Sequence, residues 1–195
     1  FRGELIRMFV DAGWIYHSEV CIWKDPVTAM QRTKALGLLH KTIRKDSSMS
    51  RQGIADYLVT MRKPGENANP ISHPGDSLPV SLWQRLASPV WMDIDPSRTL
   101  QHRSARTEDD ERHICPLQLD VIERAMELWS KPGDLVFSPF TGIGSEGYVA
   151  LKMGRRFIGS ELKRSYWELA RRNLSDVDAA EVDLFAECAE TESAQ

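Results

Sequence analysis

Residues 134–161, DLVFSPFTGIGSEGYVALKMGRRFIGSE, constrain the fold of this chain more than any other stretch. A short apolar run at 135–137 predicts a buried strand. A turn-rich loop follows, and then a helix-like stretch that ends at Gly154, because a left-handed C-terminal cap favours glycine. A second short strand at 156–159 runs into Glu161. This order predicts a βαβ unit with a glycine loop at its first turn.

The glycine loop and the acid after the second strand indicate a ligand. Gly142 and Gly144 let the backbone approach a bound molecule closely, and Glu161 can accept hydrogen bonds from ribose hydroxyls. A bare Gly-x-Gly would favour a plain structural turn, but strand, loop, helix, second strand and acid occur here together. The stretch therefore predicts a nucleotide-type ligand. It is not a P-loop, because no Gly-Lys-Ser/Thr follows the glycines.

Length and composition are those of an ordinary soluble protein. The 195 residues are 42% hydrophobic and 27% charged, enough for one core or for one core with an insertion. No apolar run is long enough to cross a bilayer, and no signal peptide is visible. The three cysteines, Cys21, Cys115 and Cys188, are scattered and odd in number. We therefore expect no disulfide framework, no metal site, no membrane partner and a cytoplasmic location.

Charge is unevenly distributed. The net charge is −3, but residues 175–195 contain seven acids and no lysine or arginine, so the rest of the chain is basic by +4. Mild basicity permits a nucleic-acid partner without proving one.

The rest of the chain predicts several further elements. Helical spacing occurs at 1–12, 27–46 and 116–129 and again after Glu161, and strand-like runs occur at 14–23 and 54–62. Residues 64–80 hold four prolines and two glycines, which indicates a loop too long for a simple connection. A short amphipathic piece follows near Trp83. The cations of 27–46 are open to two readings, a solvated face or contacts to phosphates.

Residues 111–173 resemble the DNA methyltransferases that modify exocyclic amino groups, and more narrowly their permuted β class, in which the cofactor-binding motifs follow the catalytic motif. His113 and Pro116 match the family's His-x-x-Pro-like segment. Residues 139–145, PFTGIGS, match its D-P-F-x-G-x-G-S/T loop, and Glu161 matches the acid that ends the next strand. Ser138 departs from the family, since the loop's leading aspartate usually stands there.

The resemblance implies an α/β, Rossmann-like S-adenosylmethionine-dependent methyltransferase fold with circularly permuted motif order, an incomplete sheet and a loop-rich insert. Residues 1–63 would supply later strands and helices of the sheet, and 64–112 the target-recognition insert. Residues 113–175 would form the cofactor-binding half, and 176–195 an acidic, disordered tail.

The implied cofactor is S-adenosylmethionine. The backbone at Gly142 and Gly144 would lie against its amino-acid part, Glu161 would hold the ribose hydroxyls, and residues 113–118 would line the methionine end. The predicted cofactor-binding residues are His113, Cys115, Pro116, Leu117, Gln118, Ser138, Pro139, Phe140, Thr141, Gly142, Gly144, Ser145 and Glu161.

The family's catalytic tetrapeptide, Asp/Asn/Ser-Pro-Pro-Tyr/Phe/Trp, does not occur in the sequence. Ser138-Pro139-Phe140 lacks the second proline. The other near match is Ser88-Pro89-Val90-Trp91, with Val90 in place of that proline; its Ser88, Pro89 and Trp91 are catalytic candidates, although a tryptophan packed on the core is the preferred reading. The permuted order and the start at Phe1 lead us to expect the true tetrapeptide upstream, in an N-terminal remainder of the same polypeptide.

The expected function is methyl transfer to the exocyclic amino nitrogen of adenine or cytosine in DNA, with the target base flipped out of the duplex. Four loop residues are expected either to contact the DNA backbone or to be solvated: Arg98, His102, Arg103 and Arg106. The alternatives are a methyltransferase with an RNA, protein or small-molecule substrate, and an inactive module that binds DNA or a partner protein. Target base, recognition sequence, oligomeric state and any cognate restriction enzyme stay open.

Overall fold

The computed structural model describes residues 1–100 and 116–177. Within these residues the chain divides into two compact units, residues 1–94 and residues from 95 onward, and each is described by itself. No helix among the described residues is long and apolar enough to cross a membrane. The unit boundary falls inside the predicted insert at 64–112, so the four-part division predicted from the sequence stays a prediction.

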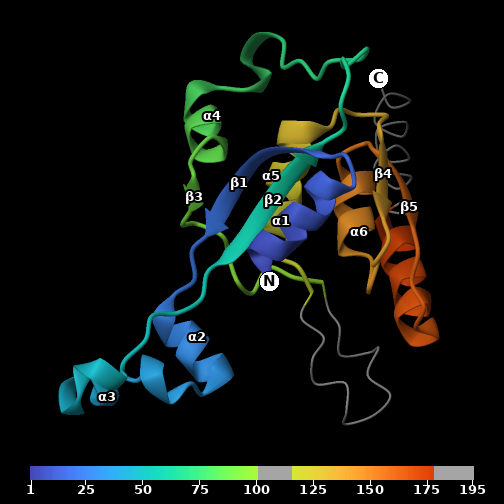
Figure 1. Cartoon of the computed structure of the whole chain (residues 1–195). Coiled ribbons are helices and arrows are strands. Elements are labelled where there is room, and N and C mark those ends of the chain that lie inside the picture. The colour runs from blue at the N-terminus through green and yellow to red at the C-terminus, as the bar shows by residue number, and fades with distance from the viewer. Residues whose placement is uncertain (101–115, 178–195) are drawn as a thin grey trace, which may run out of the picture. The chain divides into compact units, whose positions relative to one another are not determined.

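The first unit is a small sheet with one helix before its first strand and further short helices in the connections between strands (Figure 1). Its antiparallel pair is β1 and β2, whose register runs from Ile15↔Arg62 to Ile22↔Asp56 with an irregularity between Tyr16 and Ser18. The two-residue β3 pairs with β1 in parallel, which gives the order β2-β1-β3. Its helices and strands are α1 Arg2–Asp11, β1 Ile15–Ile22, α2 Pro26–Thr33, α3 His40–Lys45, β2 Asp56–Arg62, α4 Val80–Leu86 and β3 Val90–Trp91, with 3-10 turns η1 Leu36–Leu38, η2 Ser47–Met49 and η3 Gly75–Ser77.

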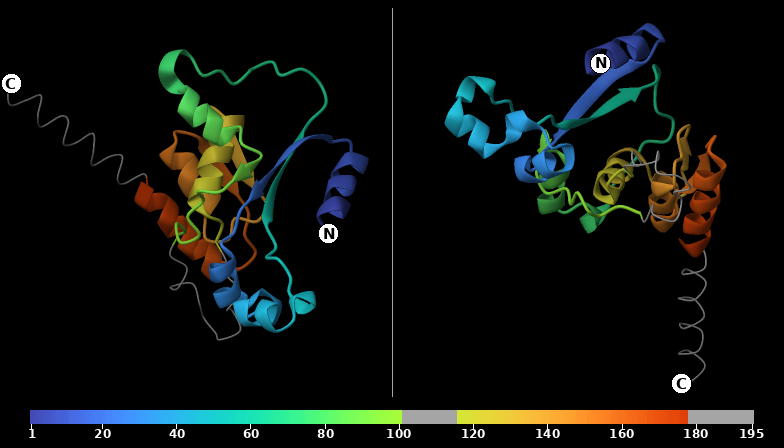
Figure 2. Two further views of the ribbon diagram at one scale, coloured as in Figure 1. Left: turned by 90° about the vertical axis from the view of Figure 1, so that its left-hand side faces the viewer. Right: turned by 90° about the horizontal axis from the view of Figure 1, so that it is seen from below.

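The helix predicted over 27–46 is wrong as a single element. α2 begins at Pro26, with Asp25 capping it through a 2.8 Å hydrogen bond from the Thr28 N–H. It ends because Lys34 takes the left-handed conformation (φ 51°, ψ 29°) and returns its N–H to the Met30 carbonyl. The chain then continues through η1 into α3, and both views in Figure 2 show these short helices beyond one end of the two long strands that they connect. The spacing of hydrophobic residues indicates which side chains share one face of a helix. It does not indicate that a single residue takes the left-handed backbone conformation and ends the helix.

The second unit is the predicted βαβ unit with a helix before it and a helix after it. The strands β4 and β5 run parallel, in a register from Leu135↔Arg156 to Ser138↔Gly159. α6 ends at Lys152, Met153 is its C-cap, and the predicted stop residue Gly154 follows in the left-handed conformation, at φ 73°. The elements are α5 Leu119–Trp129, β4 Leu135–Ser138, α6 Ser145–Lys152 and β5 Arg156–Gly159, followed by a helix at 164–177.

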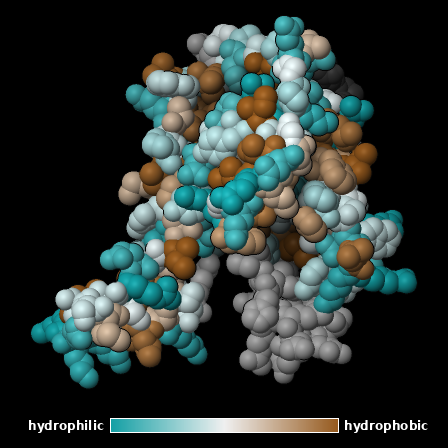
Figure 3. Space-filling model, viewed as in Figure 1, coloured by the Kyte–Doolittle hydropathy of each residue, from teal (hydrophilic) through white to brown (hydrophobic). Residues whose placement is uncertain are grey.

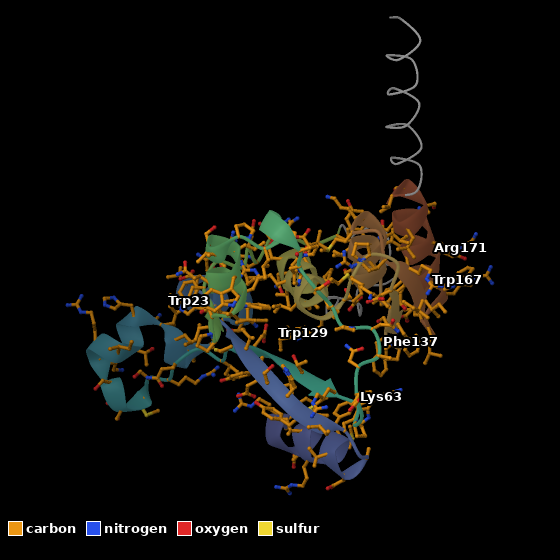
Figure 4. All side chains as sticks on the ribbon, turned by 90° about the horizontal axis from the view of Figure 1, so that it is seen from above. Trp23, Lys63, Trp129, Phe137, Trp167 and Arg171 are labelled. Carbon is orange, nitrogen blue, oxygen red and sulfur yellow. The ribbon has the colours of Figure 1, made fainter. Side chains whose placement is uncertain are left out.

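One core cluster holds the second unit together. It consists of buried residues of α5 and α6 with Val136 and Phe157 from the two strands packed against it; the buried members are Leu119, Ile122, Met126, Val149 and Ala150. Strand side chains alternate between faces, so the neighbours Leu135, Phe137 and Ile158 lie on the other face and are exposed. Phe137 is labelled in Figure 4. The helices therefore cover one face of this parallel pair.

The buried Arg155 connects α5 to the start of β5. Its guanidinium donates to the carbonyls of Met126, Ser130 and Met153, at 3.3, 2.9 and 2.6 Å. The Met126 carbonyl also accepts from the Ser130 N–H, whereas the carbonyl of Ser130, the cap residue of α5, lies beyond the reach of the hydrogen bonds within the helix. Arg155 thus satisfies the end of one helix while it anchors the strand that leads to Glu161.

Candidate cofactor-binding site

The candidate site lies where β4 and β5 end side by side. Both strands point the same way, so their carboxyl ends, Ser138 and Gly159, occupy one edge of the sheet. In open α/β sheets, ligands bind outside this edge. The loop 139–144 leaves β4 here, and Glu161 follows β5 two residues later. The sequence prediction of loop and acid at one place is confirmed as geometry.

A set of backbone hydrogen bonds closes the loop onto the end of β5. The Ser160 N–H donates to the Ser138 carbonyl and the Thr141 N–H donates to the Ser160 carbonyl, each at 3.0 Å. The Gly144 N–H donates to the Thr141 carbonyl at 2.9 Å, which makes a turn immediately before α6. Gly142 and Gly144 both have positive φ, 55° and 91°, where glycine is the residue without strain. The loop is thus a defined turn.

Glu161 contacts the glycine loop directly. Its Oε2 accepts a 2.8 Å hydrogen bond from the Gly142 N–H, and its Oε1 accepts a 2.9 Å hydrogen bond from the Lys163 N–H. Each carboxylate oxygen can accept two hydrogen bonds, so one position on each oxygen is left after these contacts. Two adjacent hydroxyls, as on a ribose, match this arrangement. A Cβ on Gly142 would meet no heavy atom within 4 Å, so the space on that side of the loop is open.

Gly147 and Asn173 are structural residues of the site that are absent from the predicted set. A Cβ on Gly147 would lie 2.7 Å from Leu174 and from the Phe157 ring, so only glycine lets α6 approach β5 and the final helix this closely. The Asn173 side chain donates to the Ile143 carbonyl at 2.8 Å and so holds the loop from the final helix. Gly147 could have been found, since it completes Gly-x-Gly-x-x-Gly with Gly142 and Gly144. Asn173 carries no such signal.

Glu146, in the first turn of α6, is the titratable group of the site with a displaced pKa. Burial raises the pKa of its carboxyl above the ordinary value. Desolvation has this effect because it disfavours the charged form. An acid in the first turn is favoured by the helix dipole, but for Glu146 the loss of hydration outweighs that benefit.

The remaining predicted cofactor residues fall into three groups. Ser138, Thr141 and Ser145 are buried in the turn, whereas Pro139 and Phe140 are exposed, Phe140 by 86%. Pro116, Leu117 and Gln118 lie directly before α5, with Gln118 at its N-terminal cap. His113 and Cys115 lie outside the described residues. Ser138 does not place a carboxylate in the loop. Its backbone carbonyl accepts the hydrogen bond from the Ser160 N–H.

The one described member of the predicted DNA-contact group is engaged within the protein. Arg98 pairs with Asp120 and donates to Glu123 Oε1 at 2.6 Å, both from α5. These carboxylates raise the pKa of the Arg98 guanidinium further above its usual range. The geometry favours a structural role, since Arg98 attaches its segment to the helix before the βαβ unit. His102, Arg103 and Arg106 lie outside the described residues.

Ser88, Pro89 and Trp91 do not form an accessible catalytic group. Trp91 is 1% exposed, and its indole N–H donates to the Leu86 carbonyl at 3.3 Å. The Pro89 carbonyl accepts from the Cys21 N–H, and the Ser88 hydroxyl donates to the Val90 carbonyl at 2.7 Å. A buried ring cannot stack on a flipped base, so the catalytic reading is corrected in favour of core packing with a short strand.

Sequence comparisons identify relatives over most of the chain. A family model described as DNA methylase, of the N6/N4 class, matches residues 4–172. The type II methyltransferase M.BglII of Bacillus subtilis is 30% identical over 121 residues, which is 61% of this chain and 32% of that protein. M2.DpnII of Streptococcus pneumoniae is 41% identical over 54 residues, 28% of this chain and 20% of its own length. The chain thus spans a third or less of these relatives.

Solved structures have the same fold. A putative DNA modification methylase from Thermus thermophilus, complexed with S-adenosyl-L-methionine, superposes with a TM-score of 0.61 at 20% identity, covering 90% of this chain and 59% of that one. The cytosine-N4-specific PvuII DNA methyltransferase gives 0.54 at 17% identity, covering 89% and 59%. The predicted methyltransferase fold is confirmed. Together with the family match over residues 4–172, these findings show that the chain belongs to the N6/N4 DNA methylase family.

Proposed function

We propose that this chain binds S-adenosylmethionine and DNA for methyl transfer to the exocyclic amino nitrogen of adenine or cytosine. The observation that carries the proposal is the hydrogen bond from the Gly142 N–H to Glu161, which joins the glycine loop to the acid at the carboxyl edge of the sheet. The family supports the reaction class. The likeness to a methylase complexed with S-adenosyl-L-methionine supports the cofactor.

The residues present fit such a cofactor. Glu161 would accept from the ribose hydroxyls, and the backbone of the loop at 142–144 would lie against the amino-acid part, approached at Gly142, where the space beside the Cα is open. Pro116, Leu117 and Gln118, with His113 and Cys115, would line the methionine end. When bound, S-adenosylmethionine supplies a methyl group activated by its sulfonium. The protein's part is to hold that group in one orientation, which contributes to rate by positioning.

The groups that contact the reacting amino nitrogen are proposed to lie on polypeptide outside residues 1–195. Two observations support this: the sequence contains no Asp/Asn/Ser-Pro-Pro-aromatic tetrapeptide, and Trp91 of the nearest match is buried. An inactive DNA-binding module of the same fold is the second candidate, favoured by the same two observations. The two candidates differ in cofactor binding, which only the first requires.

Titration calorimetry with S-adenosylmethionine tests the proposal. We expect the protein to bind, and Glu161→Ala to weaken binding by about 1 to 3 kcal/mol, roughly 5- to 150-fold, as for losing hydrogen bonds to a charged acceptor. Asp176→Ala is the matched control, because it also removes one carboxylate from the same unit, at an exposed position. It should bind like the unaltered protein.

Two results decide against the proposal. Equal affinity of a folded Glu161→Ala protein would exclude the ribose role. No binding by the unaltered protein would favour the inactive module. Competition of labelled methyl transfer by duplex DNA, RNA and protein then separates the substrate classes in the enzyme that carries the tetrapeptide.

A further inference from the structure

A basic segment lies between β1 and β2, apart from the predicted recognition insert. Residues 31–51 contain six lysines and arginines and one acid, a net charge of +5 in a chain whose total is −3. They cover the end of α2, η1, α3 and η2. Figure 3 shows hydrophilic surface at the outer edge of this segment, beside paler and hydrophobic patches. We define residues 31–51 as the basic excursion.

The local structure directs these charges outward. In α3, His40 and Arg44 are four residues apart, as are Lys41 and Lys45, which places these side chains on one side of the helix. Between them, the Thr42 hydroxyl donates to the Leu36 carbonyl at 2.8 Å, so the helix is attached to η1 through a different side. Lys41, Arg44 and Lys45 are all exposed.

The single carboxylate of the excursion is engaged by its own turn. Asp46 accepts hydrogen bonds from the N–H and the hydroxyl of Ser48, at 3.0 and 2.6 Å, and so begins η2. Within the described part of the chain, five cations of the excursion form no side-chain hydrogen bond or ion pair: Lys34, Lys41, Arg44, Lys45 and Arg51.

Several cations elsewhere in the same unit are paired. Arg2 lies 3.4 Å from Glu19, Lys24 lies 2.5 Å from Asp56, and Arg85 lies 2.9 Å from Asp93. A concentration of like charges without partners costs self-repulsion in the free protein. A polyanion relieves that repulsion and gives up its own condensed counterions in exchange. Arg7 and Arg62 of the same unit also form no ion pair with the residues that the structure describes, but they are single cations on separate elements. It is therefore the concentration of unpaired cations in residues 31–51 that indicates a surface suited to an anionic partner.

We propose that the basic excursion is a phosphate-contact surface for duplex DNA, formed by Lys34, Lys41, Arg44, Lys45 and Arg51. The proposal rests on the proposed DNA methyltransferase function and names a surface for its substrate. Such contacts position the duplex and carry no base information. An anionic membrane fits less well, because the exposed apolar residues Leu36, Ile43 and Met49 stand on three separate short elements. A membrane helix needs one continuous apolar side.

The test is fluorescence anisotropy of a labelled duplex oligonucleotide over about 50 to 200 mM salt. The variant Lys41→Gln/Arg44→Gln/Lys45→Gln should lower the slope of log affinity against log salt by roughly 2 to 3, since each phosphate that is no longer neutralised lowers it by about 0.9. At one salt concentration we expect the affinity to fall by roughly 10- to 100-fold. The preference among duplex sequences should not change.

The matched control removes the same charge elsewhere. Arg7→Gln/Arg62→Gln/Arg172→Gln alters three exposed cations, on α1, on β2 and on the final helix. This control should change the slope of log affinity against log salt by less than half as much as the Lys41/Arg44/Lys45 variant does. Circular dichroism should show both variants folded. The charge-preserving Lys41→Arg/Lys45→Arg pair should retain the slope of the unaltered protein.

Each remaining outcome overturns the inference. Equal slopes for variant and control would mean a general charge effect, and an unchanged slope for the variant would place the DNA elsewhere. Binding to phosphatidylserine vesicles but not to duplex would assign the surface to a membrane. Calorimetry with S-adenosylmethionine on the same samples separates the failure of this inference from the failure of the proposed function. If the variant binds the cofactor and its DNA binding is unchanged, only the DNA-contact surface is excluded and the proposed function is retained.

Discussion

Each of the two units of this protein is stabilised in a different way. Of the fourteen buried hydrophobic side chains among the described residues, ten belong to the second unit, and only Val20, Ile22, Leu86 and Trp91 belong to the first. In the second unit, α5, α6 and the strands share one cluster, and the loop bonds onto the end of β5. The first unit depends more on strand pairing along β1 and β2.

This difference matches what each unit is proposed to do. A cofactor must be held at fixed positions, and a loop anchored at Ser160, Glu161 and Asn173 provides them. DNA backbone contacts tolerate more variation, because lysine and arginine reach phosphates with long side chains. The comparison predicts that substitutions in the second unit act through packing, and that substitutions in the first act through charge.

The largest expected effect comes from two helical glycines, one in each unit. Gly147→Ala in α6 forces a Cβ to within 2.7 Å of Leu174 and Phe157, and we expect a loss of about 1 to 3 kcal/mol of unfolding free energy. Gly3→Ala in α1 meets nothing within 4 Å and should gain about 0.5 to 1 kcal/mol from helix propensity. Urea unfolding measures both. Equal effects would contradict the assignment of tight packing to the second unit.

A smaller effect is expected at Arg98. Arg98→Met removes the ion-pair partner of Asp120 and Glu123 and should cost about 1 kcal/mol of stability, a modest figure because the Arg98 side chain is 40% exposed. Affinity for DNA should stay the same, unlike that of the Lys41/Arg44/Lys45 variant. Urea unfolding and duplex anisotropy on one preparation test both statements. A stable protein that has lost DNA affinity would return Arg98 to the DNA contacts.

The smallest effect concerns pH. Burial raises the pKa of Glu146, so the folded state holds that proton more readily than the unfolded state does. The resulting penalty on the ionised carboxylate is present above the folded pKa and disappears as pH falls through it. Glu146→Gln should therefore be slightly more stable than the unaltered protein at neutral pH, and the difference in Tm should narrow on acidification.

An exposed acid in the other unit is the control for this measurement. Glu66→Gln, in the loop after β2, should leave Tm unchanged across the same pH range. A difference between Glu146→Gln and the unaltered protein that widened on acidification would reverse the sign of the burial effect.

Sequence reasoning succeeded where local chemistry decides the outcome. The spacing of apolar residues predicted the strands at 135–138 and 156–159 and the helix between them. The conformational preference of glycine predicted that this helix stops before Gly154. It failed at 27–46, because one residue in the left-handed conformation divides a helix without altering the pattern. It also missed Gly147, although Gly147 stands at the third position of Gly-x-Gly-x-x-Gly; its contact with Leu174 and Phe157 could not be read from the sequence.

The sequence alone determined the βαβ unit, its glycine loop and the acid at Glu161, because short-range order and φ preferences act within a few residues. Only the tertiary structure decided which charged and aromatic side chains are available. Arg98 meets Asp120 and Glu123 across more than twenty residues, and Trp91 is buried. Lys41, Arg44 and Lys45 meet no carboxylate among the described residues. Burial and pairing depend on residues distant in sequence, and those neighbours are known only once the chain has folded.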